Sequence, residues 1–78
     1  MEEGNDKLME EEVKITLKKV YTSLKQRGYD PISQLSGYLI SNDLGYISNY
    51  KNARNELSKL DRNIIIELLL KEYLKWNI

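Results

Sequence analysis

The sequence contains no cysteine and no histidine. The absence of cysteine excludes a disulfide framework and any cysteine-based metal site. The absence of histidine removes the commonest general base and the commonest transition-metal ligand, so it excludes a nucleophile–histidine pair and a zinc finger. Catalysis would have to rest on carboxylates, lysines or tyrosines alone. We therefore expect a protein that is not an enzyme and that has no metal site and no cofactor.

Long apolar runs are also missing. The longest run, Ile64–Ile66, is followed after one glutamate by Leu68–Leu70, and this stretch is far too short to span a bilayer. The N-terminus is acidic and lacks the basic and apolar regions of a signal peptide. We expect one small cytoplasmic domain of 78 residues with a modest core, which relies on well-made helices or on a partner chain.

The zero net charge hides an asymmetry along the chain. Residues 1–12 carry six acids and one base, whereas the remainder carries eleven bases and six acids. An acidic arm of net charge −5 thus precedes a body of net charge +5. The arm is interpreted either as a solvated, frayed terminus, or as a tail that tunes binding by the body or folds back onto it.

Apolar residues recur at helical spacing and no strand alternation persists, so the predicted fold class is all-α. We expect a flexible, disordered acidic arm over residues 1–9 and a single compact domain of four to five helices over residues 10–78. The helices are predicted at residues 10–27, 31–40, 50–60 and 62–75, with a short helical turn at 44–47. The expected inward residues of the first three helices are Val13, Leu17, Val20, Tyr21, Leu24, Ile32, Leu35, Leu39, Tyr50, Ala53, Leu57 and Leu60.

Residues typical of helix ends support these helix boundaries. Gly28 suits the left-handed position that follows a helix, and Asp30-Pro31 suits the cap and first residue of the next one. Gly37 inside a helix indicates close approach of another element. Ser41–Asp43 is predicted to form a turn, and Asp61 is predicted to cap the last helix.

Apolar residues cover more than one side of the last predicted helix. A helix of that kind must be buried on several sides, and a chain this short has little protein to cover it. We therefore expect a homodimer in which this helix supplies core and dimer contacts, chiefly through Ile65, Leu69, Tyr73 and Trp76. The alternative is that the helix lies centrally in the monomer and the others wrap it.

A basic set near the middle of the chain, made of Lys51, Arg54, Lys59 and Arg62, suggests partner binding. Lys51 and Arg54 are three residues apart on one predicted helix face, and Arg62 joins them if the chain stays helical through Asp61. With Tyr38, Tyr46 and Tyr50 nearby, this forms a mixed aromatic and basic surface of the kind that recognises partners. The alternative is a solvated helix face with ion pairs to Glu56 and Asp61. A calcium site at Asn42, Asp43 and Asn49 fits no EF-hand spacing, and turn chemistry explains these residues better.

A nucleic-acid-binding regulator that uses the same basic face is the second hypothesis. The first two helices could form a helix-turn-helix, but the segment PISQLSGYLIS carries no charge and would make a poor phosphate-facing element. Nucleic acid is therefore the less favoured partner.

The residues also resemble a known family. The run GYDPISQL at residues 28–35, then GYLIS at 37–41, Tyr46-Ile47, KNAR at 51–54 and LSKLDRNIIIELLLKEYL at 57–74 resembles the IreB family, also called ReoM. The resemblance extends over about residues 13–76. It implies a helical homodimer with a flexible arm and no catalytic activity. It also implies negative regulation of peptidoglycan synthesis and cell-wall antibiotic resistance, through control of MurA turnover by Clp protease downstream of a PASTA-type serine/threonine kinase.

The arm departs from the family pattern. Asp6-Lys7-Leu8-Met9 is the nearest match to the family's Asp-x-Thr-Met stretch, with Leu8 at the phosphoacceptor position. Residues 1–15 contain no serine, threonine or tyrosine, so no phosphoacceptor is expected there. The positions that match basic residues of the family, Lys51, Arg54 and Arg62, are the expected partner contacts, together with Tyr50.

Overall fold

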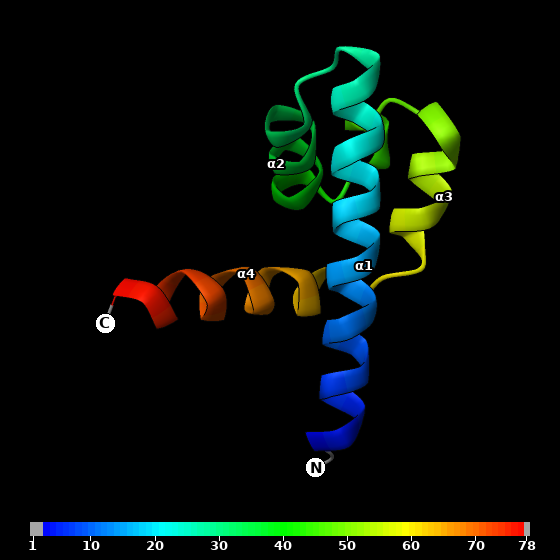
Figure 1. Cartoon of the computed structure of the whole chain (residues 1–78). Helices are drawn as coiled ribbons and strands as arrows, with labels where there is room; N and C mark the ends of the chain where they lie inside the picture. Colours follow the sequence, from blue (N-terminus) through cyan, green and yellow to red (C-terminus); the bar gives the residue numbers. More distant parts are fainter. Residues whose placement is uncertain (1–2, 78) are drawn as a thin grey trace.

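Helices make up nearly all of the computed structural model, which describes the backbone of residues 3–77 and the side chains of residues 8–75. The elements are α1 (Glu3–Arg27), α2 (Pro31–Ser41), the 3-10 turns η1 (Leu44–Tyr46) and η2 (Tyr50–Asn52), α3 (Ala53–Ser58) and α4 (Arg62–Asn77). α2 and α3 pack on opposite sides of the second half of α1, and α4 leads away crosswise from α1 (Figure 1). No strand occurs in residues 3–77, which confirms the all-α prediction.

The first helix is longer than the sequence analysis predicts. α1 begins at Glu3 rather than at Glu10, so the predicted start is wrong and the backbone of residues 3–9 is helical. Acidic residues near a helix N-terminus are stabilised by the helix dipole, which is consistent with this extension. Arg27 lies 17 positions after Glu10, a separation of about 26 Å along the helix. While α1 is helical, its acidic start therefore cannot fold back onto its own basic end.

The predicted caps are confirmed. Gly28 ends α1 with φ 95°, a left-handed conformation that favours glycine. The Ser33 backbone N–H donates to Asp30 Oδ1 at 3.2 Å, and Pro31 is the first residue of α2. Asn42 ends α2 with φ 61°. At α4, the Asn63 N–H donates to Asp61 Oδ1 at 2.9 Å. Side chains thus satisfy N–H groups that have no partner within the first turn of these helices.

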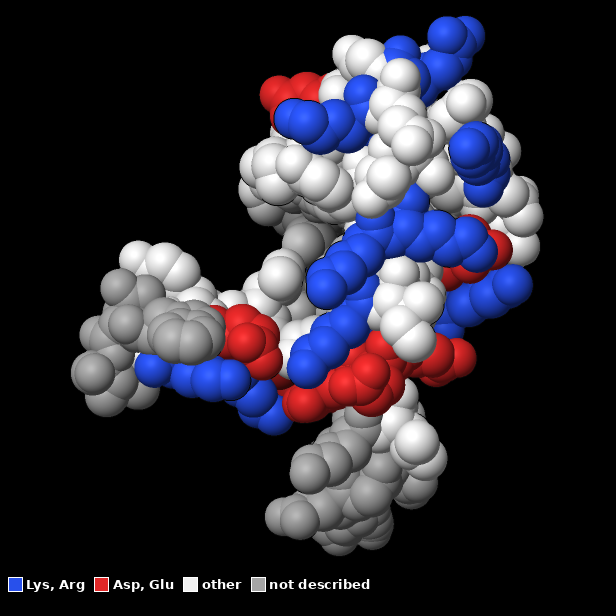
Figure 2. Space-filling view, in the orientation of Figure 1, with Lys and Arg blue, Asp and Glu red and all other residues white. Residues whose placement is uncertain are grey.

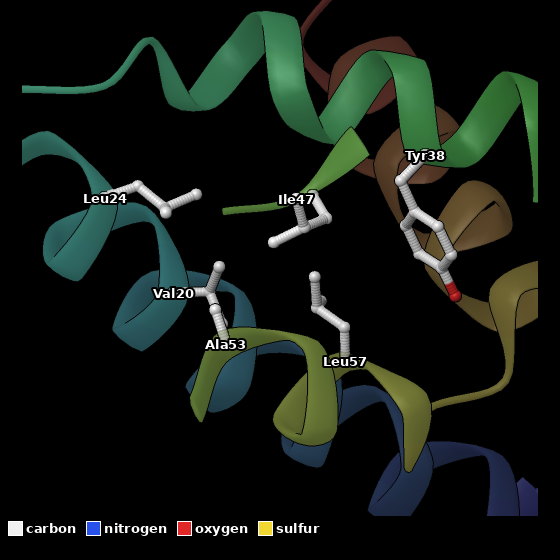
Figure 3. Packing of buried hydrophobic residues seen from close by; sticks show 6 residues of the cluster. All are labelled: Val20, Leu24, Tyr38, Ile47, Ala53 and Leu57. Carbon is white, nitrogen blue, oxygen red and sulfur yellow. The ribbon is translucent and has the colours of Figure 1, made fainter. Parts of the chain in front are cut away.

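The main core lies between α1, α2 and α3, with Ile47 from the η1–η2 connection at its centre (Figure 3). Ile47 is fully buried between these elements. The other buried members of this cluster are Val20, Leu24, Tyr38, Ala53 and Leu57. A second cluster, made of Val13, Ile65 and Leu68, joins the root of α4 to the middle of α1. Most of the predicted inward residues of α1 and α3 are therefore confirmed.

The orientation of α2 differs from the prediction. Ile32, expected inward, is 64% exposed, whereas Tyr38 is buried in the core. Tyr21 of α1 was also expected inward and is 38% exposed. Both side chains line an open groove, which accounts for their exposure.

The predicted helix over residues 50–60 is also interrupted. Lys51 and Asn52 have φ of 53° and 65°, which an α-helix cannot accommodate, so α3 contains only Ala53–Ser58. The chain then turns before α4 begins at Arg62, as predicted. Lys51 and Arg54 therefore do not share one face of a regular helix, contrary to the sequence-based expectation.

The last helix is not wrapped by the others. Ile65 and Leu68 face α1 and are buried, but Leu69 is 45% exposed and Tyr73 is 66% exposed. The side chain of Trp76 lies outside the described residues. The alternative of a central α4 is thus wrong, while the dimer stays a prediction. Within the described chain, none of the helices combines the length and apolar character that crossing a membrane requires.

We expect Gly37→Ala to destabilise the fold. A Cβ at this position would lie 2.5 Å from Cδ1 of Tyr46, so the ring would have to move out of a contact that glycine alone allows. Overpacking of this kind costs about 1–3 kcal/mol, against a gain of about 1 kcal/mol in helix propensity. Urea unfolding followed by circular dichroism measures the difference.

The control is the same substitution without the tyrosine ring. In a Tyr46→Ala background, Gly37→Ala should stabilise, because only the helix-propensity term remains. Equal effects of Gly37→Ala in the two backgrounds would show that the Tyr46 contact does not constrain residue 37.

Candidate partner-binding site

Two cations lie near the ring of Tyr50. The guanidinium carbon of Arg27, the last residue of α1, is 5.7 Å from the ring centroid. Nζ of Lys51, in η2, is 5.6 Å from the same centroid. Both distances are within the range of a cation–π interaction. The structure therefore brings together Tyr50 and Lys51, which the sequence indicated, with Arg27 at the end of α1.

The backbone at this cluster is strained. Lys51 and Asn52 occupy the left-handed region in succession, which costs a non-glycine residue of order 1–3 kcal/mol. Asn49 stabilises the segment, since its Oδ1 accepts a hydrogen bond from the Arg54 N–H at 3.1 Å. Strained residues of this kind concentrate at binding sites, where the surrounding structure holds them in place.

Arg54 supports this segment from the inside. Its Nε donates to the carbonyl oxygen of Ile47 at 2.7 Å in a partly buried position. The backbone of a non-helical segment has no ladder of its own, so a side-chain donor satisfies the carbonyl. Arg54 thus has a structural contact in addition to its predicted role as a partner contact.

Arg62 contacts a different part of the chain. Its Nη1 donates to the carbonyl oxygen of Leu39 at 2.6 Å, which ties the first turn of α4 to the end of α2. Because α3 ends at Ser58 and the chain turns before α4, Arg62 does not continue the surface of Lys51. The structure brings Tyr50, Lys51 and Arg54 into one segment and leaves Arg62 outside it.

Ion pairing does not neutralise this cluster. Glu56, which the alternative hypothesis paired with the basic set, instead approaches Lys19 of α1 at 3.7 Å. Among the described residues, neither Arg27 nor Lys51 forms an ion pair. Basic side chains cover much of the second half of α1, whereas acidic ones gather nearer its start (Figure 2). Two cations on an aromatic ring, both without a carboxylate from residues 8–75, form a surface suited to an acidic group.

Of the three nearby tyrosines, Tyr50 is the one that the two cations contact. Tyr38 is buried in the core, and the ring of Tyr46 packs against Gly37. The mixed aromatic and basic character thus rests on Tyr50. The position of Arg27 beside it has no local sequence signal, because 23 positions separate the two residues.

The polar residues considered for calcium have turn functions. Asp43 Oδ1 accepts from the Gly45 N–H at 2.8 Å, and Asn49 caps Arg54 as described. Asn42 has the left-handed conformation that ends α2. No group of three or more acidic side chains placed to hold a metal ion occurs in the described part of the chain.

A comparison with known protein families indicates the class of protein to which this surface belongs. The family model described as IreB regulatory phosphoprotein matches residues 1–75. The chain belongs to the IreB family. The family resemblance inferred from residues 13–76 is therefore confirmed, and the chain is a regulatory protein by family. As an IreB member it has an exposed Leu8 on helical backbone, and its first hydroxyl residue, Thr16, is partly buried within α1.

We expect Arg54→Ala and Arg62→Ala to lower the free energy of unfolding, and Lys51→Ala to leave it nearly unchanged. Each arginine donates to a partly buried carbonyl, and loss of such a bond costs about 1–3 kcal/mol. An exposed side chain without such a bond contributes about 0.5 kcal/mol or less. Denaturant unfolding of the three variants measures the order of their free energies of unfolding. Equal stability of the three would contradict a structural role for the arginines.

Proposed function

We propose that this IreB-family chain is a non-enzymatic cytoplasmic regulator that acts by protein–protein contact. The observation that carries the proposal is the cluster of exposed Arg27 and Lys51 on the half-buried Tyr50, whose two cations have no carboxylate partner among the described residues. Such a surface suits an acidic segment of a partner protein. The match to a family of regulatory phosphoproteins over residues 1–75 supports a regulatory outcome of that contact.

The resemblance suggests the pathway in which this contact acts. The proposed role is negative regulation of peptidoglycan synthesis and of cell-wall antibiotic resistance, through control of MurA turnover by Clp protease. The upstream input in this scheme is a PASTA-type serine/threonine kinase. Because Leu8 occupies the family's phosphoacceptor position, the kinase would have to act on this chain at another hydroxyl residue or through binding alone.

Self-association is the second part of the proposal. Beyond the root of α4, Leu69, Leu70, Tyr73 and Leu74 are all at least 45% exposed on one helix. Burial of a large apolar side chain contributes about 1.5–3 kcal/mol, so a second copy that covers this helix would gain substantially. We propose that these residues form the contact of a homodimer, with Ile65 in the core of each protomer.

The partner contact predicts a charge-specific loss of binding. The double variant Arg27→Ala/Lys51→Ala should fold normally and should capture less of the cell-wall regulatory partners from a host extract than the unchanged protein. Lys14→Ala is the matched control, since it removes an exposed cation on the acidic half of α1. Capture is quantified by mass spectrometry of the co-purified proteins.

A gel shift separates this proposal from nucleic-acid binding. A shift with duplex or single-stranded nucleic acid, whose log-affinity falls steeply with log-salt, would favour the alternative function. Equal capture by the double variant and by Lys14→Ala would overturn the Arg27–Tyr50–Lys51 site.

The dimer contact predicts that Leu70→Glu yields a monomer. A charge on an apolar contact leaves an unpaired ion in the interface, which opposes association. Analytical ultracentrifugation measures the mass of the variant and of the unchanged protein. Ile40→Glu is the control, because Ile40 is 84% exposed on α2 and does not line the groove. A dimer that persists in Leu70→Glu would contradict an interface at α4.

A further inference from the structure

Lys51 and Asn52 form a left-handed pair immediately before α3, with φ of 53° and 65°. Tyr50 and Lys51 are consecutive residues, and consecutive side chains of a regular helix do not face each other. Nζ of Lys51 nevertheless lies 5.6 Å from the centroid of the Tyr50 ring. The left-handed φ of Lys51 therefore accounts for a cation–π contact that a helical conformation of the same residues would not make.

The hydrogen bonds at this turn replace those of a continuous helix. In an α-helix, the Arg54 N–H would donate to the carbonyl oxygen of Tyr50, four residues earlier. Here that carbonyl oxygen accepts from the Ala53 N–H, and the Arg54 N–H donates to Asn49 Oδ1 at 3.1 Å. The side chain of Asn49 thus satisfies the N–H group that the interruption of the helix leaves without its usual partner.

A regular helix is the conformation that competes with this turn, and helical spacing predicts one over residues 50–60. The left-handed region is disfavoured by a factor of about 5–30 for an L-residue other than glycine. Asparagine tolerates this region better than most residues, and the side chain of Asn52 makes no capping hydrogen bond to α3. Asn52 therefore contributes to the turn through its backbone conformation rather than through its side chain.

We propose that Asn49 and Asn52 are positioning residues of the partner-binding site, and that the turn they hold sets its affinity for acidic groups. Asn49 holds the turn through its bond to the Arg54 N–H, and Asn52 holds it through its left-handed backbone. Neither residue has to touch the ligand, because the effect passes through the place of Lys51 on the Tyr50 ring. A site whose geometry is fixed in advance loses less conformational entropy when it binds. The proposal rests on the function proposed above and names what fixes the geometry of its site.

Two substitutions of Asn52 separate the backbone conformation from the side chain. Asn52→Gly and Asn52→Ala both remove the amide, but glycine adopts a positive φ without steric cost, whereas alanine favours the right-handed helix. Asn49→Ala removes the acceptor of the Arg54 N–H. We expect Asn52→Gly to bind an acidic ligand as the unchanged protein does, and Asn52→Ala and Asn49→Ala to bind it about 5- to 30-fold more weakly.

The ligand used is a short polyglutamate peptide, with a glycine–serine peptide of the same length as its uncharged counterpart. Two-dimensional NMR measures the affinity, and without ligand an intense NOE between the amide and Hα protons of residue 52 reports its positive φ. This NOE should persist in Asn52→Gly and weaken in Asn52→Ala.

Val13→Ala is the control for stability, since it removes buried apolar atoms and lies 14 positions before Arg27. Its affinity should equal that of the unchanged protein. All affinities are measured where urea unfolding shows every variant to be folded, so that a loss of stability alone leaves them unchanged.

The outcomes distinguish the two proposals. Equal affinity of Asn49→Ala, Asn52→Ala and the unchanged protein overturns the positioning role and leaves the acidic-ligand site intact. Equal weakening by Asn52→Gly and Asn52→Ala also overturns the positioning role, because the side chain would then matter and not the backbone. Absence of chemical-shift changes at Arg27, Tyr50 and Lys51 with polyglutamate overturns the site itself, and the positioning role with it.

Discussion

The burial of Ile47 is the constraint on which the middle of this protein depends. Ile47 lies in a connection without regular structure, yet its side chain occupies the centre of the core between α1, α2 and α3. Its neighbours must therefore satisfy their backbone groups through side chains. The Ser48 N–H donates to Gln34 Oε1 at 2.8 Å, Gln34 Nε2 donates to Ser48 Oγ at 3.0 Å, and Arg54 Nε donates to the Ile47 carbonyl. These bonds link α2 and α3 through the connection between them.

The strained backbone that follows has the same origin. After Ile47 enters the core, the chain has few residues in which to reverse direction and begin α3 against α1. Lys51 and Asn52 make this reversal in the left-handed region, and the reversal places Tyr50 beside the last residue of α1. The aromatic and basic cluster is thus a consequence of how the core closes, and hydrogen bonds of Asn49 and Arg54 hold the neighbouring backbone.

Local chemistry in the sequence was enough to predict the fold class and most helix ends, because glycine, proline and aspartate act within one turn of their own position. Gly28, Asp30 and Asp61 all cap where expected. The interruption at Lys51 could not be predicted in this way, since lysine and asparagine fit a helix and only the distant burial of Ile47 excludes one. The same holds for the site: Tyr50 and Lys51 are neighbours in sequence, whereas Arg27 reaches them through the packing of α1.

The exposure of Ile32 on α2 shows that helical spacing alone does not predict which apolar residues of a small protein are buried. Ile32 follows the same helical spacing as Leu35 and Leu39, and the spacing correctly groups the three on one side of the groove. Periodicity identifies an apolar face but not the element that covers it, and within a single chain of this length no element is available. The four apolar residues on the outer side of α4 present the same problem from the other side of the groove.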